Sequence, residues 1–134
     1  MKFLTCTHCS QRVFFENTRC GNCGSALGFV PQEMLMVSFS IDNLGGWCRL
    51  GVPGLAAQRP CRNYVAENVC NWMVAADDPN ALCVSCRTTH IIPALSIGEN
   101  HAKWATLEQA KRSLIYTLLS LRLPLPLDLP VHRA

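Results

Sequence analysis

Four cysteines near the amino terminus are the residues whose type and spacing most clearly indicate chemistry. Cys6 and Cys9 form one C-x2-C pair, Cys20 and Cys23 form another, and ten residues separate the two pairs. Two intervening residues let both sulfurs of a pair reach one ion from a tight turn, and two facing turns complete a tetrahedron at Zn–S distances of about 2.3 Å. The spacing predicts a four-cysteine zinc site of the zinc-ribbon kind. The alternatives are disulfides, a redox C-x-x-C pair, or iron in place of zinc.

A second group of cysteines follows in the middle of the chain. Cys83 and Cys86 form another C-x2-C pair, while eight residues separate Cys61 from Cys70 and twelve separate Cys70 from Cys83. This irregular spacing favours a second zinc site, and the alternative is a set of buried core cysteines. Cys48 is left over, as a free thiol or a core residue.

Neither group of cysteines leaves a coordination position for a substrate. Four thiolates fill the tetrahedral shell of zinc, and closed sites of this kind are structural. The adjacent carboxylates Asp77 and Asp78 precede Pro79 and Asn80, a combination typical of a solvated turn rather than of acid–base catalysis. His8 is expected to face solvent, because four better-placed thiols supply the ligands. The sequence therefore predicts two Zn²⁺ ions and no catalytic residue.

The cysteines also indicate a cellular compartment. No apolar h-region of a secretory signal is present, and no stretch approaches the roughly 18 apolar residues of a membrane span. The cytosol keeps thiols reduced, so paired cysteines there are metal ligands or redox groups. We expect a cytoplasmic protein with no membrane partner.

The charge of the chain argues against nucleic acid as a partner. The formal net charge is +3. Each zinc bound by four thiolates changes the charge by −2, so two sites bring the total to about −1. The basic residues are scattered rather than clustered on one face. A nucleic-acid-binding zinc ribbon therefore stays the alternative function.

The elements that must position the cysteines are short, except for one helix. Residues 3–5 and 12–15 are predicted as short strands that flank a cysteine turn, and residues 35–41 alternate as a longer strand does. Glycines and prolines predict an irregular stretch over about 42–60. We expect a small, metal-stabilised α+β fold with a zinc ribbon of short β-hairpins over 1–34, a strand and linker over 35–60, a second zinc-binding unit over 61–98, an amphipathic helix over 99–122, and a Pro/Leu-rich tail over 123–134.

The helix, over about 101–121 with Asn100 as its N-cap, is the clearest prediction of regular structure. Glu108 is expected to pair with Arg112 across one turn. Lys111 lies inside the apolar arc, so it should snorkel or meet a buried anion. The prolines of the tail end the helix, because they lack amide donors. The predicted apolar arc consists of Trp104, Leu107, Ala110, Leu114, Ile115, Leu118 and Leu121, and the polar side of Gln109, Arg112, Ser113, Tyr116 and Ser120.

Four stretches, which together cover most of the chain, carry a family resemblance. They are residues 6–29, 70–79 (CNWMVAADDP), 82–87 (LCVSCR) and 104–125. Together they resemble the amino-terminal part of a bacterial zinc-binding metallopeptidase family that begins with a zinc ribbon. The resemblance implies that Cys61, Cys70, Cys83 and Cys86 act as one set of ligands, and Cys48 lies outside the family pattern. Arg122 stands where the pattern has a glycine, between the helix and the Leu-Pro-Leu that follows.

The resemblance also carries an expectation about function. In that family the peptidase lies beyond this segment and carries an H-E-x-x-H helix, whose histidines bind the catalytic zinc while its glutamate acts as general base. The histidines here are His8, His90, His101 and His132, and none begins this motif. The resemblance thus implies a non-catalytic zinc-binding module that is not an enzyme on its own. We expect the helix over 101–121 and the leucine-rich tail to dock a protein partner or the missing peptidase domain.

Overall fold

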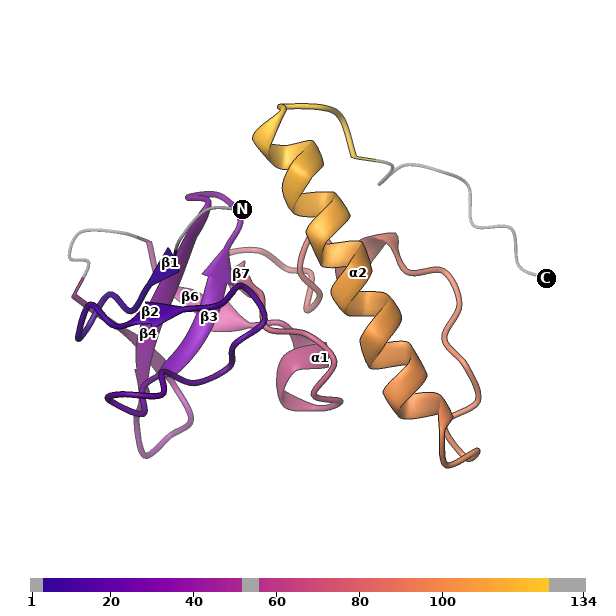
Figure 1. Cartoon of the computed structure of the whole chain (residues 1–134), viewed down its shortest axis with the longest axis horizontal. Helices are drawn as coiled ribbons and strands as arrows, with labels where there is room; N and C mark the ends of the chain where they lie inside the picture. The colour runs from indigo at the N-terminus through magenta and orange to yellow at the C-terminus, as the bar shows by residue number, and fades with distance from the viewer. Residues whose placement is uncertain (1–3, 52–55, 126–134) are drawn as a thin grey trace.

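The computed structural model of the protein describes residues 4–51 and 56–125, and within them the chain forms the small α+β fold that the sequence predicts. Three small antiparallel sheets lie on one side of a long helix (Figure 1). In chain order the elements are β1 (Leu4–Thr5), β2 (Arg12–Val13), β3 (Ala26–Val30), β4 (Leu35–Ile41), β5 (Trp47–Leu50), β6 (Gln58–Pro60), α1 (Arg62–Val65), β7 (Met73–Ala75), the 3-10 turn η1 (Cys86–Thr88) and α2 (Asn100–Ser120).

The ribbon at the amino terminus is built from the β1–β2 hairpin and the sheet β3–β4–β5, in which β4 is central. The predicted strand over 35–41 is confirmed as β4, but its predicted alternation is wrong. Ser38 is fully buried and Ile41 is half exposed. The turn between Cys6 and Cys9 covers the face of β4 that carries Ser38, so this face is not solvated.

The sequence predicts an irregular stretch over 42–60, but this stretch contains two strands, β5 and β6. A tight turn starts β5: the Asp42 carboxylate accepts hydrogen bonds from the backbone amides of Leu44 and Gly46, at 2.9 and 2.7 Å. This turn returns the chain antiparallel to β4, with Ile41 opposite Trp47. The glycines that indicate a linker therefore serve a hairpin instead.

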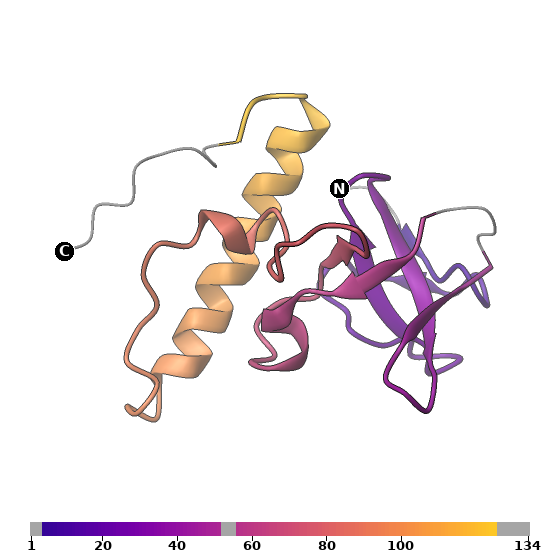
Figure 2. The same ribbon diagram turned by 180° about the vertical axis from the view of Figure 1, so that it is seen from behind.

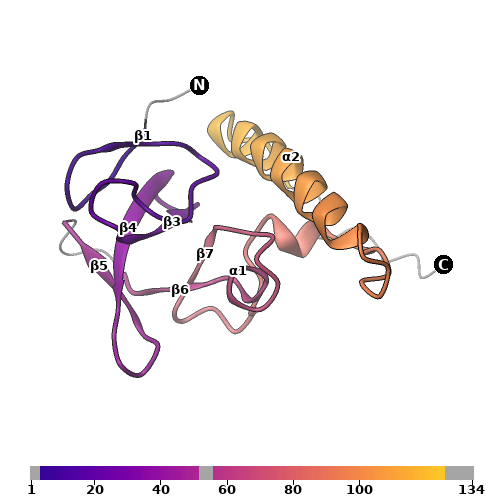
Figure 3. The same ribbon diagram turned by 60° about the horizontal axis from the view of Figure 1, so that its bottom comes forward.

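Aromatic side chains join the ribbon, the second cysteine unit and α2 into one core. Phe29 of β3 lies 4.8 Å from Trp72 and 5.2 Å from Phe15, measured between ring centroids, and Phe15 lies 5.1 Å from Tyr116 of α2. Figure 3 shows β6, β7 and α1 between the ribbon and α2. The predicted segments therefore share one apolar interior.

Hydrogen bonds lock the second cysteine unit against the ribbon. The hydroxyl of Tyr64 in α1 donates to the carbonyl of Leu27 at 2.5 Å. The side-chain amide of Asn71 donates to the carbonyls of Phe15 and Asn17, at 2.8 and 3.0 Å. Both polar side chains are buried, so these bonds replace the water that burial removes.

The buried face of α2 differs from the predicted arc. Trp104 and Ile115 are buried as expected, but so are Glu108 and Arg112, while three leucines of the arc are exposed. The helix begins at Asn100, yet its N-cap is Glu99, and the Asn100 side chain donates to the carbonyl of Ala94. No helix in the described residues is long and apolar enough to cross a membrane. The leucine pattern misleads because two polar anchors, Glu108 and Arg112, are buried on the packed face, whereas the leucines of α2 that contact the core, Leu118 and Leu119, are only partly buried.

These anchors replace the predicted pair between Glu108 and Arg112. Arg112 donates to the carbonyl of Val69 at 2.6 Å and forms an ion pair with Glu16 at 3.3 Å, so it contacts both the second unit and the ribbon. Glu108 instead pairs with Lys111 at 3.0 Å, which confirms that Lys111 meets a buried anion. Residues 89–99 run along the side of α2 that faces away from the ribbon (Figures 1 and 2).

The end of α2 is a Schellman motif with an arginine at the position that favours glycine. The amide of Leu123 donates to the carbonyl of Leu118, and the amide of Arg122 donates to that of Leu119. Arg122 has φ of 56°, in the left-handed region. An L-residue there is strained relative to glycine. The arginine therefore does not lengthen the helix, and it closes the helix at a cost in free energy.

Candidate metal centres

Two turns of the same shape bring together the four cysteines of centre 1 (Cys6, Cys9, Cys20 and Cys23). In the first turn the amide of Ser10 donates to the carbonyl of Cys6, and in the second the amide of Gly24 donates to that of Cys20. Ser10 and Gly24 have φ of 67° and 75°. The residue after each C-x2-C pair is thus left-handed, although only one of the two is a glycine.

The sulfur atoms of centre 1 are spaced for a metal ion. Cys6 Sγ lies 3.6 Å from Cys23 Sγ, Cys9 Sγ lies 3.6 Å from Cys20 Sγ, and all four sulfurs lie within 4.8 Å of one another. A tetrahedron with Zn–S bonds of about 2.3 Å has edges of about 3.8 Å. A disulfide needs about 2.05 Å. The donor set therefore fits zinc and not a covalent bridge.

Ser38 of β4 supports centre 1 from beneath. Its hydroxyl lies 2.9 Å from Cys6 Sγ and accepts a hydrogen bond from the backbone amide of Thr7 at 3.1 Å. The Thr7 hydroxyl in turn accepts from the amide of Ser38 and donates to the carbonyl of Leu50. Sequence reasoning missed this role, because strand alternation predicts that Ser38 lies on the solvated face. No local signal distinguishes Ser38 from Ser40, which is exposed.

Gly51 allows β5 to approach the first cysteine turn closely. A Cβ at this position would lie 1.7 Å from the carbonyl oxygen of Thr7, and Gly51 has φ of 75°. Only glycine avoids both the clash and the backbone strain. The end of β5 is therefore packed directly against the metal-binding turn.

Hydrogen bonds favour the thiolate form of Cys6. Burial raises the pKa of Cys6, and this is the largest single effect, but hydrogen bonds from the Ser38 hydroxyl and from the backbone of Cys9 and His8 together lower it to about 6. A thiol with this pKa is largely ionised at neutral pH, in the form that binds zinc.

Centre 2 (Cys61, Cys70, Cys83 and Cys86) lies beneath α1, β7 and η1. Cys61 is the N-cap of α1 and donates its backbone amide to the carbonyl of Trp72, so β6 and β7 place it. Cys86 begins η1, and the amide of Arg87 donates to the carbonyl of Cys83. Elements far apart in sequence therefore bring the irregularly spaced cysteines together.

The sulfurs of centre 2 are close-packed and fully buried. Cys70 Sγ lies 3.7 Å from Cys83 Sγ, and all four sulfurs lie within 4.8 Å of one another. Backbone amides point at the sulfurs: Trp72 donates to Cys70, Cys83 to Cys61 and Cys86 to Cys83, at 3.3–3.4 Å. None of these side chains is more than 3% exposed. Amide donors of this kind stabilise thiolates.

A cation is needed before all four thiols of centre 2 can ionise. Hydrogen bonds from the three neighbouring cysteines lower the pKa of Cys61, whereas burial raises the pKa of Cys83. Uncompensated negative charges cannot accumulate in a site without water. A divalent metal supplies the compensation, and its binding releases the protons.

The remaining residues singled out in the sequence lie outside both centres. His8 is exposed and Cys48 is an exposed thiol outside both centres. Asp77 and Asp78 belong to a turn, in which the amide of Asp78 donates to the carbonyl of Ala75. Asp78 also pairs with Arg87 at 2.5 Å. The two carboxylates therefore form no acid–base pair.

Comparisons with known proteins support a zinc-ribbon region in this chain. A family model described as a zinc-ribbon domain matches residues 3–97, which include both centres. Uncharacterised proteins of Mycobacterium bovis and of two strains of Mycobacterium tuberculosis are each 36% identical over 126 residues, or 93% of this chain and 33% of each relative. The chain thus spans about a third of the length of the curated relatives it matches. No solved structure matches the chain.

Proposed function

The chain belongs to the zinc-ribbon domain family, and we propose that it is a non-catalytic module that uses two zinc centres to present α2 to a catalytic domain. The observation that carries this proposal is a row of exposed leucines along α2 and its C-cap, the leucine stripe (Leu107, Leu114 and Leu121). These side chains are 68%, 57% and 63% exposed. Contiguous exposed apolar surface of this kind marks interaction sites on soluble proteins.

The stripe is regular, and the helix that carries it is fixed. Its members are seven residues apart, which is about two helical turns, so they lie in line along one side of the helix. On its other face α2 is held by Trp104, Ile115 and the buried Arg112. Further apolar side chains are exposed in residues 89–99, which run beside the helix (Figure 2). A rigid apolar surface suits docking, because little conformational entropy is lost when a partner covers it.

Two observations favour a catalytic domain as the partner. About two thirds of each mycobacterial relative lies outside the part that matches this chain. The motifs over 70–79 and 82–87 resemble those of a metallopeptidase family whose peptidase follows the zinc-binding region. We therefore assign the role of partner to a peptidase-type domain, in the same or in a separate chain, and we assign no reaction to this module itself.

The metal is assigned as zinc, two ions per chain, because each donor set consists of four cysteine sulfurs within 4.8 Å of one another, a set that tetrahedral zinc prefers. Iron prefers the same donors in sites of this geometry and is the substitute to test for. The module is assigned to the cytoplasm, since the cytosol keeps cysteine thiols reduced and so available as metal ligands.

Nucleic acid is disfavoured as a partner, because several arginines are used inside the molecule. Arg49 pairs with Glu33 at 2.9 Å and Arg112 pairs with Glu16. Arg59 donates to four backbone carbonyls between residues 75 and 80. Guanidinium groups committed in this way are not available to neutralise phosphates.

A binding experiment tests the proposal. The non-matching two thirds of the Mycobacterium bovis relative, produced as a separate chain, is titrated with this protein. We expect saturable binding that is at least tenfold weaker when the leucine stripe is replaced by glutamine (L107Q, L114Q and L121Q). The matched control places glutamine at three other exposed, heptad-spaced positions of α2 (T106Q, S113Q and S120Q). Equal affinity of the two variants, no binding, or a dimer of this chain that only the stripe variant dissociates would contradict docking through this face.

A further inference from the structure

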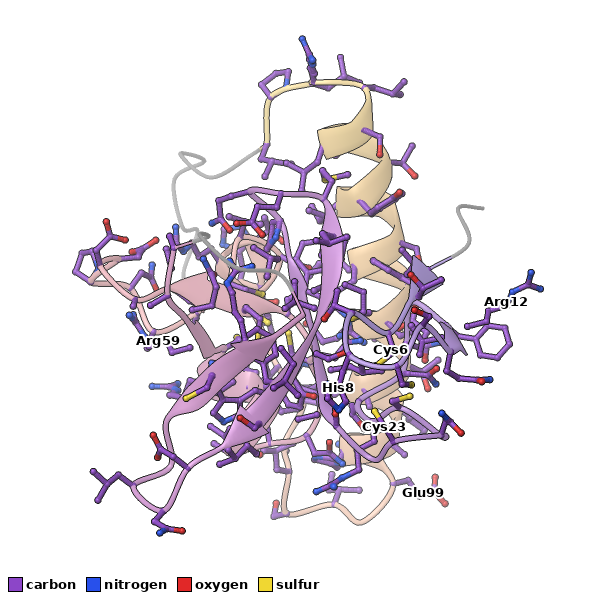
Figure 4. All side chains as sticks on the ribbon, turned by 90° about the vertical axis from the view of Figure 1, so that its left-hand side faces the viewer. Cys6, His8, Arg12, Cys23, Arg59 and Glu99 are labelled. Carbon is purple, nitrogen blue, oxygen red and sulfur yellow. The ribbon has the colours of Figure 1, made fainter. Side chains whose placement is uncertain are left out.

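The two metal centres differ in how far their sulfurs are exposed. All four sulfur-bearing side chains of centre 2 are buried, whereas in centre 1 Cys23 is exposed and Cys9 is partly exposed. The two centres also lie on different parts of the fold, with centre 1 on the outer loops of the ribbon. Figure 4 shows Cys6 and Cys23 there, close to His8. A reagent in solution therefore reaches one centre and not the other.

A surface hollow leads to the exposed sulfur. Cys23 lines a hollow of 320 Å³ together with Arg19, Ser25 and Ser40. The Ser25 hydroxyl lies 3.1 Å from Cys23 Sγ. The hollow thereby opens to solvent beside the exposed side chain that Cys23 contributes to centre 1. The hollow thus gives a small reagent both space and a reactive atom.

We propose that Cys23 is the site at which peroxides modify this protein, and that the oxidation opens centre 1 while centre 2 stays intact. This inference rests on the proposed binding of zinc at both centres. The Cys23 thiolate attacks one peroxide oxygen, so that an S–O bond forms, the O–O bond breaks and hydroxide leaves. Cys6 Sγ is 3.6 Å away, and its thiolate then attacks the sulfenic sulfur. An S–S bond forms, the S–O bond breaks and a second hydroxide leaves.

The consequence of this oxidation is confined to one end of the molecule. Two thiolates have lost two electrons, and the peroxide has been reduced to two hydroxides that take up protons as water. Two of the four donors of centre 1 are then consumed, so it no longer holds a metal ion. The sulfurs of centre 2 are buried in the core, so peroxide does not reach them and centre 2 keeps its metal ion. The protein would thereby carry one exchangeable centre and one permanent centre.

The test follows zinc release and sulfur oxidation in the zinc-loaded full chain. Cys48→Ser is introduced throughout, because Cys48 is exposed and would otherwise react. Hydrogen peroxide is added, released zinc is read with a chromophoric chelator, and oxidised cysteines are mapped by differential alkylation and mass spectrometry. We expect one zinc per chain to leave at least tenfold faster than the other, with a Cys6–Cys23 disulfide as the first product.

A variant that fills the hollow makes the test specific. Ser40→Phe places a ring in the hollow without replacing a cysteine, and it should slow the fast phase at least threefold while leaving the slow phase unchanged. Release of both ions at one rate, first oxidation at centre 2, or a fast phase that S40F does not slow would overturn the proposal. A protein that holds fewer than two zinc ions before peroxide is added would instead refute the proposed function, so the two failures are distinguishable.

Discussion

Replacing Ser38 with alanine should weaken centre 1 without touching a cysteine. The hydroxyl of Ser38 lies 2.9 Å from the Cys6 sulfur, and it also accepts a hydrogen bond from the backbone amide of Thr7. The side chain is fully buried, so no water can replace it after substitution. The alanine variant keeps the strand and its packing, and removes one donor to the sulfur and one acceptor for an amide.

The size of the effect follows from these two contacts. A hydrogen bond to a charged group contributes about 1.5–3 kcal/mol, and a buried amide without an acceptor costs about 1–3 kcal/mol. The bond to the thiolate matters most when the metal is bound, so zinc affinity at centre 1 should fall about 10–100-fold. In S38A the Thr7 amide has lost its acceptor whether or not the metal is bound. This unsatisfied amide should lower the free energy of unfolding by about 1–3 kcal/mol.

Native mass spectrometry during a chelator titration measures the affinity change directly, because it separates chains with two, one and no zinc ions. For S38A we expect the one-zinc species at chelator concentrations at which the wild type still holds two. Ser40→Ala is the matched control, since Ser40 lies on the same strand and is exposed. If S38A and S40A lost their first zinc at the same chelator concentration, Ser38 would have no role in the centre.

Three further substitutions test other parts of the fold. Gly51→Ala should destabilise the protein by at least about 2 kcal/mol in denaturant unfolding, because the new Cβ meets the Thr7 carbonyl. The control Gly21→Ala, which has open space around it, should change stability by less than about 0.5 kcal/mol. Equal effects of the two substitutions would refute the close approach of Gly51 to Thr7. Arg122→Gly should raise stability by about 0.5–1 kcal/mol by relieving the left-handed arginine, whereas a similar gain in Arg122→Ala would point to the side chain instead. Ile115→Ala should cost about 2–4 kcal/mol and the neighbouring Leu114→Ala less than about 1 kcal/mol. Similar costs at both positions would instead support the predicted apolar arc, which contains both residues.

Local spacing was enough to predict the elements whose structure depends on neighbours in sequence. Each C-x2-C pair of centre 1 corresponds to one turn, and the β-forming residues over 35–41 correspond to one strand, although its burial does not alternate. The helix over 101–121 is offset by only one residue at each end. In each case short-range geometry sets the structure, and a pattern of residue types is sufficient to indicate it.

Features that depend on contacts between distant segments could not be predicted in this way. Ser38 is buried because a turn more than 30 residues away covers it. Arg112 is buried because Val69 and Glu16 offer it an acceptor and a counterion. Helical periodicity places this arginine on the polar side, since periodicity registers apolarity and not the partners of a charge. The same limit explains why β5 and β6 were predicted as irregular.

The metal content of the purified protein, measured by native mass spectrometry, tests the central claim most directly. The closed sets of four sulfurs at centres 1 and 2 predict a mass that corresponds to two zinc ions per chain. A folded chain that carries no metal, or only one ion, would contradict it.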